Sequence, residues 1–467
     1  MRSRKAVVLF FLLPIYWSLG ANLYGQSDST VLTYQEFLDN VVRYHPLARK
    51  ANLQFQLAEA ERLAARGTLD PVLSSNWAEK NFDDKLYYRQ YQGKLLIPTP
   101  LGIDLVGGYE NNEGVFLNPE HTTDEFGLWN VGLEANILQG LWVNERRTAL
   151  QQAEIFQNLA SNEQQILLND LLYHSSTAYL EWQQYTFFAE VLAENLSLAA
   201  TYLENTKQSF FNGEKTAMDT LEAYILYQDA ENLWNKNAAY LVKTRQNVEN
   251  YLWFNDVPAL LSPSAIPETY GNTILPDNFN PDISSVVNGH PWIQASINKI
   301  AYYEIEQRLK REKLKPKLKL KYNPLLATSE ESIAPNYSLS NYKWGFDFSM
   351  PLLFRSERAA VQAGQIKLME LELELENKSN ELRNKLEGSL QQQAILQQQL
   401  AVQRQNVEGY RLLLEGENQK FLFGESSVFL LNKRQEKYID GQLKLIELSI
   451  QLQKEWLNYL LYSNGLN

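Results

Sequence analysis

The stretches VVRYHP at residues 41–46 and VVNGHP at residues 286–291 share one pattern and lie 245 residues apart. At the same separation, Asp70-Pro71 in the first segment matches Lys315-Pro316 in the second. The residues between these landmarks are free of proline after the His-Pro pair and rich in helix formers in both copies. A match that extends without a gap predicts an internal repeat, so we expect the chain to contain two similar structural units.

The His-Pro pairs mark where helices begin. Proline is favoured at the first position of a helix because its missing N–H would have no partner there. We therefore expect His45 and His290 to be N-cap residues. Metal binding is the alternative, but the four histidines of the chain show no ligand-like spacing.

The same order of elements is expected in both halves. Residues 142–208 contain neither proline nor glycine and predict a helix about 100 Å long. Five prolines within residues 255–282 predict a linker, because proline interrupts helices and central strands. The remaining expectations are helices at 31–66, 216–254, 292–313, 355–420 and 425–462, with strands and loops at 71–138 and 316–350.

These elements predict a division into a signal peptide, two repeats and a linker. Residues 2–5 are basic and residues 7–19 are apolar, the pattern of a secretory signal peptide over residues 1–26. The first repeat is expected at 27–254 and the second at 283–467. The proline-rich segment 255–282 joins them.

A glycine interrupts each long helix near its end. The stretch KQSFFNGEK at 207–215 parallels NQKFLFGES at 418–426, with Gly213 and Gly424 in matching positions. Glycine often ends a helix in the left-handed conformation, which costs other residues free energy. We expect both glycines to adopt that conformation in a tight turn between two helices.

The helices carry more than one apolar stripe. In the last helix one apolar stripe follows 4-3 spacing; it consists of Ile439, Leu443, Ile446, Ile450, Leu457 and Leu460. A second apolar stripe lies on another face of this helix; it consists of Leu445, Leu448, Leu452, Trp456 and Tyr459. The first long helix keeps the same rhythm, with His174 expected in its seam. Two seams predict two neighbours for each helix, as in a ring of helices with water inside and outside.

The strand segments alternate apolar and polar residues. In YKWGFDFSM at 342–350 the apolar residues are Trp344, Phe346, Phe348 and Met350. The stretches KLKLKY at 317–322 and WNVGLEANI at 129–137 alternate in the same way. A membrane barrel with a wet lumen requires this pattern, and a water-soluble sandwich also produces it. The strands of one chain are too few to close a barrel, so several copies are expected to close it together.

Composition excludes several functions. The chain has a formal net charge of -12 and no cysteine, which argues against nucleic-acid binding and excludes disulfides and thiolate metal sites. No phosphate-binding glycine loop, zinc-protease motif or nucleophile elbow occurs. We therefore expect no enzyme, no catalytic residues, no cofactor and no metal.

These residues resemble the TolC-like outer-membrane efflux family, in a Bacteroidetes-type form. The resemblance covers essentially the whole mature chain. It rests on the order of short motifs: the duplicated His-Pro starts, the approaches from Arg66 to Pro71 and from Lys313 to Pro316, MPLLF at 350–354, MDTL at 218–221, and GESSVFLLNKRQ at 424–435.

The resemblance implies a mainly α-helical fold with a transmembrane β part. A homotrimer would form a helical tunnel in the periplasm of a Gram-negative cell, joined to a shared barrel of twelve strands in the outer membrane, four from each chain. It implies a passive exit duct of a tripartite efflux or type I secretion system. Its partners would be a periplasmic adaptor, an inner-membrane pump and outer-membrane lipid. The alternative is an exported periplasmic coiled-coil adaptor or binding protein.

The resemblance also implies where the tunnel entrance lies. In the family, acidic residues six and nine positions after the second glycine can line it. Here these positions are Leu430 and Lys433, while the same offsets from Gly213 give Asp219 and Glu222. Both turns, with Gly213 and Gly424, are therefore expected at the entrance and docking end. The alternative is that these residues are ordinary packing and surface positions.

Overall fold

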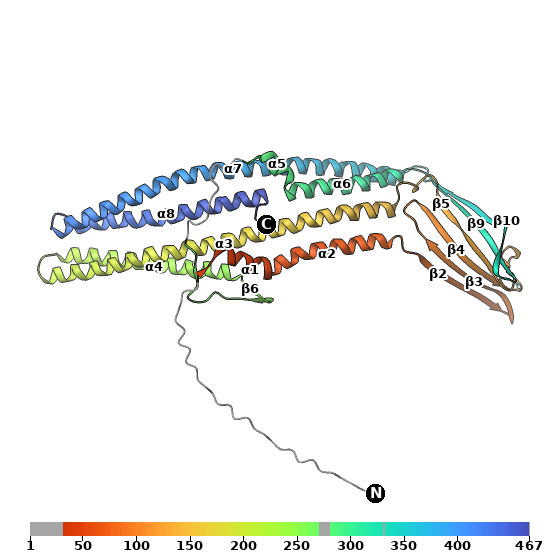
Figure 1. Ribbon diagram of the computed structural model, residues 1–467, viewed down its shortest axis with the longest axis horizontal. Coiled ribbons are helices and arrows are strands. Elements are labelled where there is room, and N and C mark those ends of the chain that lie inside the picture. The colour runs from red at the N-terminus through yellow and green to blue at the C-terminus, as the bar shows by residue number, and fades with distance from the viewer. Residues whose placement is uncertain (1–30, 270–280, 330–331, 467) are drawn as a thin grey trace, which may run out of the picture.

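The computed structural model describes residues 31–269, 281–329 and 332–466. The expected signal peptide, residues 1–26, lies outside these ranges. The chain is elongated, with a long helical body that ends in a single sheet (Figure 1). Among the described residues, no helix is both long enough and apolar enough to cross a membrane.

The helices follow the expected order. Those of the first half are α1 (Tyr34–Tyr44), α2 (Pro46–Gly67), α3 (Glu145–Phe211) and α4 (Ala217–Glu249). Those of the second half are α5 (Ile283–Gly289), α6 (Pro291–Glu312), α7 (Arg355–Leu422) and α8 (Val428–Ser463). The helix expected over 31–66 is divided at His45, and a two-residue strand, β1 (Val31–Leu32), precedes it.

Both His-Pro pairs start helices in the same way. His45 and His290 have extended backbones, and the imidazole Nδ1 of each accepts a hydrogen bond from the N–H two residues later, at 3.2 and 3.1 Å. Proline follows as the first residue of α2 and of α6. The prediction that these histidines are N-caps is confirmed.

His290 should make stability depend on pH. Burial lowers the pKa of its imidazole to about 4, below the usual 6.5. The unfolded chain therefore binds a proton that the folded chain does not, and the contribution to stability is lost as the pH falls from about 6.5 towards 4. His290→Asn keeps an N-cap acceptor without this titration, so its unfolding free energy should fall less over that range. Denaturant titrations at pH 7 and 5 measure the unfolding free energy of both proteins. An equal decrease in the two proteins between these pH values would contradict the role given to His290.

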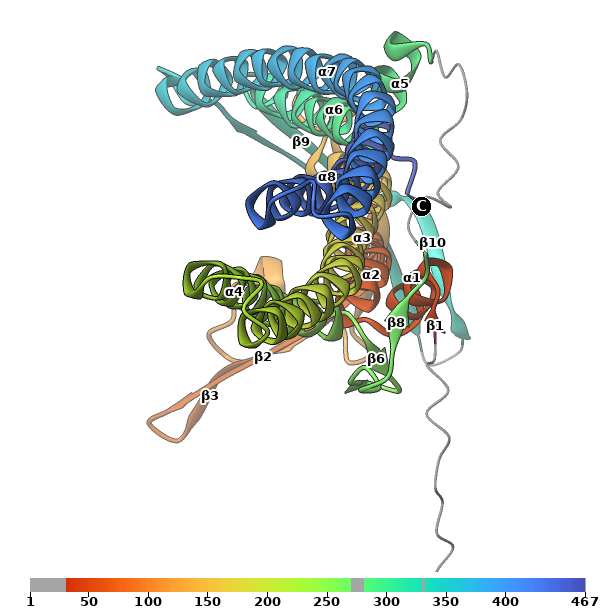
Figure 2. The ribbon, with the colours of Figure 1, turned by 90° about the vertical axis from the view of Figure 1, so that its left-hand side faces the viewer.

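The helices form two rows that share α3 and α7. Next to the sheet, α2 contacts α3, α3 contacts α6 and α6 contacts α7; towards the other end, α4, α3, α8 and α7 follow each other (Figures 1 and 2). The two stripes of α8 bury against different neighbours. Ile446, Ile450 and Leu457 pack with Leu180 of α3, while Leu448 and Leu452 pack with Leu396 and Leu400 of α7. The prediction that two seams mean two neighbours is confirmed.

The seam expected for α3 is wrong at one residue. His174 is exposed, while Ser175 and Ser176 beside it are completely buried. The hydroxyl groups of Ser176 and Tyr34 of α1 are hydrogen bonded at 2.7 Å. Because α3 contacts α1, α2, α4, α6 and α8, its buried surface does not follow a single heptad stripe.

A compact apolar cluster joins α1, α3, α4 and the linker. Phe37, Tyr179 and Trp182 are completely buried in it. The hydroxyl group of Tyr179 donates a hydrogen bond to the carbonyl of Leu32 at 2.6 Å and accepts one from the N–H of Glu268 at 3.1 Å. The linker region contains three two-residue strands, β6 (Trp253–Phe254), β7 (Val257–Pro258) and β8 (Ile266–Pro267), and β8 pairs with β1.

The sheet is antiparallel, with the order β10-β9-β5-β4-β3-β2. Its strands are β2 (Val72–Phe82), β3 (Lys85–Ile97), β4 (Ile103–Glu113), β5 (Leu128–Asn136), β9 (Lys317–Ser329) and β10 (Ser332–Ser349). A short 3-10 turn (Pro119–His121) lies between β4 and β5. The first half supplies four of these strands and the second half supplies two.

The strand number corrects an expectation. The resemblance implied four strands per chain, and the described sheet has six. The first half turns back once more, at Asp83 and Asp84, which both adopt positive φ angles of 55°. Two residues in this conformation close a tight hairpin. This turn converts residues 72–97 into an additional pair of strands.

Candidate functional site

Both glycine turns lie at the end of the body farthest from the sheet (Figure 1). Gly213 has φ +80° and Gly424 has φ +76°. At each turn the glycine N–H and the following N–H donate to carbonyls of the last helical turn, at 3.0 and 2.9 Å in both cases. These are the paired bonds of a Schellman motif, so the expected left-handed conformation is confirmed at both glycines.

The helices that leave the turns begin differently. Thr216 caps α4, and the Asp219 carboxylate accepts hydrogen bonds from the N–H and the hydroxyl group of Thr216, each at 2.8 Å. These bonds lower the pKa of Asp219. Ser427 caps α8, and Leu430 occupies the position that corresponds to Asp219. Asp219 is therefore part of a capping box, a reason for a carboxylate there that the sequence expectation did not include.

The other predicted entrance residues belong to separate contacts. Lys433 is exposed and pairs with Glu436 of the same helix at 2.6 Å. Glu222 is half-buried on α4. Burial, with Glu222 and Asp219 near by, raises the pKa of the Tyr202 hydroxyl to about 12. Tyr202 also lies 6.2 Å from the Phe421 ring, between ring centroids, so α3 and the end of α7 meet close to the turns.

Large apolar side chains at the turns were missed in the sequence. Phe211 is 84% exposed and Phe423 is 82% exposed. Phe210, Met218, Leu422, Phe429 and Leu430 are also exposed near the same turns. Exposed apolar residues that gather in one place often mark a protein interaction site. The phenylalanines just before each glycine were the available signal.

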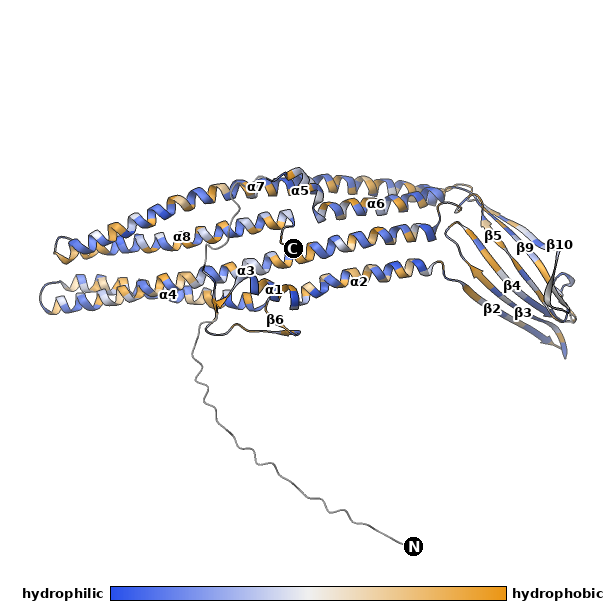
Figure 3. Ribbon diagram, in the orientation of Figure 1, coloured by the Kyte–Doolittle hydropathy of each residue, from blue (hydrophilic) through white to orange (hydrophobic). Residues whose placement is uncertain are grey.

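The sheet has one continuous apolar face. Residues from all six strands lie on this face and are between 38% and 79% exposed; they include Leu73, Trp77, Leu95, Leu105, Trp129, Val131, Leu133, Leu320, Tyr322, Trp344, Phe346 and Phe348. The strands show the corresponding alternation in Figure 3. Exposing this much apolar surface to water is unfavourable, so the face requires an apolar environment.

The opposite face is polar and its charges are paired. Glu134, buried on β5, lies between Lys94 of β3 at 3.0 Å and Lys319 of β9. Lys321 pairs with Asp347 of β10 at 2.5 Å. These ion pairs link neighbouring and next-neighbouring strands on the side away from the apolar face.

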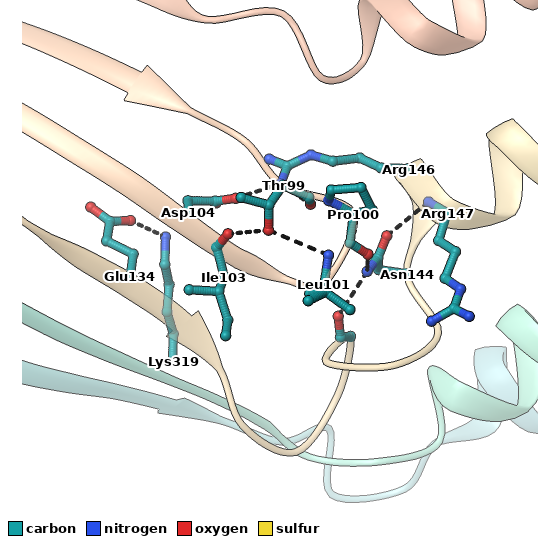
Figure 4. Close-up of polar contacts among 11 residues, drawn as sticks. Thr99, Pro100, Leu101, Ile103, Asp104, Glu134, Asn144, Arg146, Arg147 and Lys319 are labelled. Atoms are coloured by element: carbon teal, nitrogen blue, oxygen red, sulfur yellow. Dashed lines mark hydrogen bonds and ion pairs between the residues drawn. The ribbon is translucent and has the colours of Figure 1, made fainter.

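A polar junction fixes the sheet to α3 (Figure 4). Arg146 donates a hydrogen bond to Asp104 of β4 at 2.5 Å. The side-chain amide of Asn144, the N-cap of α3, donates to the carbonyl of Pro100 at 2.9 Å. Gly102, at φ +64°, is required here because a Cβ would lie 2.2 Å from the carbonyl oxygen of Gly140. These contacts connect β4 and the turn that precedes it to the N-terminal end of α3.

Within residues 31–269, 281–329 and 332–466, no three histidine, aspartate or glutamate side chains are grouped so that they could hold a metal ion.

Comparisons with known proteins identify the fold. No protein-family model matches the sequence, and no curated protein matches it. Solved structures do match. The CmeC outer-membrane channel of Campylobacter jejuni superimposes with a TM-score of 0.67 at 10% identity, over 92% of this chain and 85% of that one.

Two further structures give the same result. The outer-membrane protein VceC of Vibrio cholerae has a TM-score of 0.64 at 11% identity, over 92% of this chain and 95% of that one. The open state of the MtrE outer-membrane channel of Neisseria gonorrhoeae has a TM-score of 0.60 at 13% identity, over 93% and 89%. The chain therefore has the TolC-like fold of these outer-membrane channels.

Proposed function

We propose that the protein is a passive conduit across the outer membrane, the exit duct of a tripartite efflux or type I secretion system. The observation that carries this proposal is the sheet, with one exposed apolar face and one charge-paired polar face, fixed to a helical body about 100 Å long. Lipid suits the first face and a water-filled lumen suits the second. Energy would come from a pump in the inner membrane.

The working form is a homotrimer. The two rows of helices and the sheet all end in unpartnered edges, with α2, α4 and β2 on one side and α7 and β10 on the other. Ile366, Met369 and Leu373 form an exposed stripe on α7, and Leu53 and Leu57 form one on α2. Such unlike edges can meet head to tail, and a head-to-tail contact closes into a ring of three when neighbouring copies are rotated by one third of a turn.

Two repeats would give each copy its two helical hairpins. They correspond to residues 27–254 and 283–467, after a signal peptide over 1–26. The matching N-caps, Schellman turns and hairpin ends support this division. In the described part of the linker, the backbone of Glu268 is hydrogen bonded to Tyr179 and Gln183 of α3.

The entrance is proposed to lie at the two glycine turns. A periplasmic adaptor would cover the exposed Phe211 and Phe423, while Asp219, Glu222, Leu430 and Lys433 would line the approach to the tunnel. Apolar side chains that are more than four-fifths exposed support a docking role. The mixed charges predict weaker cation preference than an all-acidic ring would give.

Gly424→Val should weaken docking without affecting membrane insertion. Valine in the left-handed conformation costs about 1–2 kcal/mol, so the turn should shift and move Phe423. Export and adaptor cross-linking should both decrease. Gly409→Val is the matched control, because Gly409 lies inside α7 with open space around it. Export by Gly424→Val at the level of the control would contradict the assigned role.

Carbonate washing, oligomeric mass and bilayer conductance together test the conduit. The protein should stay in washed membranes, run as a trimer in mild detergent and give discrete conductance steps in a planar bilayer. A protein that washes off as a monomer or dimer would instead be the periplasmic adaptor. A membrane-bound trimer that passes no ions even after its turns are opened by mutation would also oppose the proposal.

A further inference from the structure

We propose that the hairpin β2–β3 is part of the barrel wall and that β2 of one copy pairs with β10 of the next. With six strands from each of three copies, the wall would then have eighteen strands instead of twelve. This inference rests on the proposed trimeric channel. It concerns the number of strands that each copy contributes and the strand at which copies join.

The apolar face continues through the hairpin without a change of side. Leu73 of β2 pairs with Leu95 of β3, and Trp77 pairs with Tyr91. An aromatic row crosses four strands on this face, from Trp77 to Tyr91 at 6.2 Å, Tyr91 to Tyr109 at 6.1 Å, and Tyr109 to Trp129 at 4.8 Å, between ring centroids. Aromatic rows border the apolar band of membrane barrels, and half of this one belongs to β2 and β3.

The charged residues also place the hairpin in the wall. Lys94 of β3 reaches Glu134 on β5 from the polar face. Beyond the aromatic row, towards the strand tips, Arg89 pairs with Glu79 of β2 at 2.8 Å and with Glu113 of β4 at 2.7 Å. Charges therefore lie outside the apolar band or on the lumen side of these strands, as lipid exposure requires.

The two outer strands have the correct directions for a seam. In this antiparallel sheet of six strands, β2 runs away from the helices and β10 runs back towards them. Placed side by side in a ring, they are antiparallel to each other. Each presents unpaired backbone groups along its outer side, and in lipid such groups need partners. The occupant that fits both edges is a second copy of this chain.

The helices support the same arrangement. β2 follows α2 directly in the chain, and β10 leads directly into α7. The head-to-tail contact that joins α2 to the neighbouring α7 therefore brings β2 and the neighbouring β10 to the same side. If β4 formed the seam instead, β3 would have to separate from β4. These two strands are paired at nine residues of β3.

A wider wall changes where cargo is restricted. Barrel diameter grows roughly in proportion to strand number, so the lumen cross-section of eighteen strands is about twice that of twelve. The barrel would not be the narrow point, and size selection would fall to the helical end with the glycine turns. The conduit would therefore suit bulky cargo as far as the barrel is concerned.

Disulfide trapping tests the seam, because the chain has no cysteine of its own. Cysteines at Leu73, Ser75 or Trp77 of β2 are combined singly with cysteines at Trp344, Phe346 or Phe348 of β10. The matched controls combine the same β10 positions with Leu105, Tyr109 or Asn111 of β4. All these positions share one face of the sheet. Carbonate-washed membranes are oxidised and analysed on non-reducing gels.

At least one β2–β10 pair should give a covalent ladder that ends at three copies, while the β4–β10 pairs stay monomeric on the gel. A ladder from β4–β10 pairs would overturn the inference and indicate a twelve-stranded wall. A membrane-inserted trimer without cross-links from any of the nine β2–β10 pairs would also overturn it. Variants and parent that wash off the membrane would refute the proposed channel itself, a different result from either of these.

Discussion

Leu133→Arg should prevent stable insertion of the protein into the outer membrane. Leu133 lies on the apolar face of the central strand β5, between Leu105 of β4 and Tyr322 of β9, and is 46% exposed. An arginine on the lipid face near the middle of the bilayer costs about 2–4 kcal/mol in each copy. The cost applies to each of the three copies of a trimer, so the amount of trimer in carbonate-washed membranes should fall severely.

The matched control places the same side chain on the other face. Gln92 of β3 belongs to the polar face, where it pairs with Asn76 of β2 and Glu110 of β4. Gln92→Arg adds the same charge next to a carboxylate, so insertion should remain normal. Equal amounts of washed-membrane trimer for both variants would mean that the apolar face does not contact lipid.

Trp182→Ala should have the largest effect on the helical body. The indole is completely buried and lies 5.7 Å from the Tyr179 ring at 87°, in the cluster that joins α1, α3 and α4. Replacing a buried tryptophan by alanine typically costs about 3–5 kcal/mol. The melting temperature of the detergent-solubilised protein, followed by helical circular dichroism, should therefore fall clearly.

Trp142→Ala is the control for this experiment, because Trp142 is 67% exposed. The cluster around Trp182 also holds β8 and the start of the described chain against α3, through Tyr179. Protease sensitivity of the linker should therefore rise together with the loss of stability. A melting temperature unchanged from the control would mean that this cluster does not hold the body together.

Local signals in the sequence predicted much of the fold. The His-Pro pairs predicted both N-caps, since capping depends on residues within one helical turn. Gly213 and Gly424 predicted the two Schellman turns for the same reason. The two stripes of α8 predicted its two neighbours. The alternation in β5, β9 and β10 predicted a sheet with unlike faces.

Three features of the structure were not predicted. The turn at Asp83-Asp84 was not located within residues 71–138, because two aspartates at positive φ give a weaker turn signal than glycine. His174 was expected in a seam, but α3 has five helical neighbours and its buried side does not follow one stripe. The capping role of Asp219 was not predicted, although Thr216 and Asp219 have the three-residue spacing of a capping box.

The sequence by itself determined where helices begin at the two His-Pro pairs, where the two long helices end, and which strands alternate apolar and polar residues. These properties depend on the types and spacing of residues that are close together in the chain, so they can be predicted from short stretches of sequence. Only the tertiary structure decided that six strands form one sheet with unpartnered edges at β2 and β10. Strand order depends on pairing between residues that are far apart in the chain, such as those of β5 and β9. The free energy that favours one order comes from many contacts made at once, which no short stretch of sequence contains.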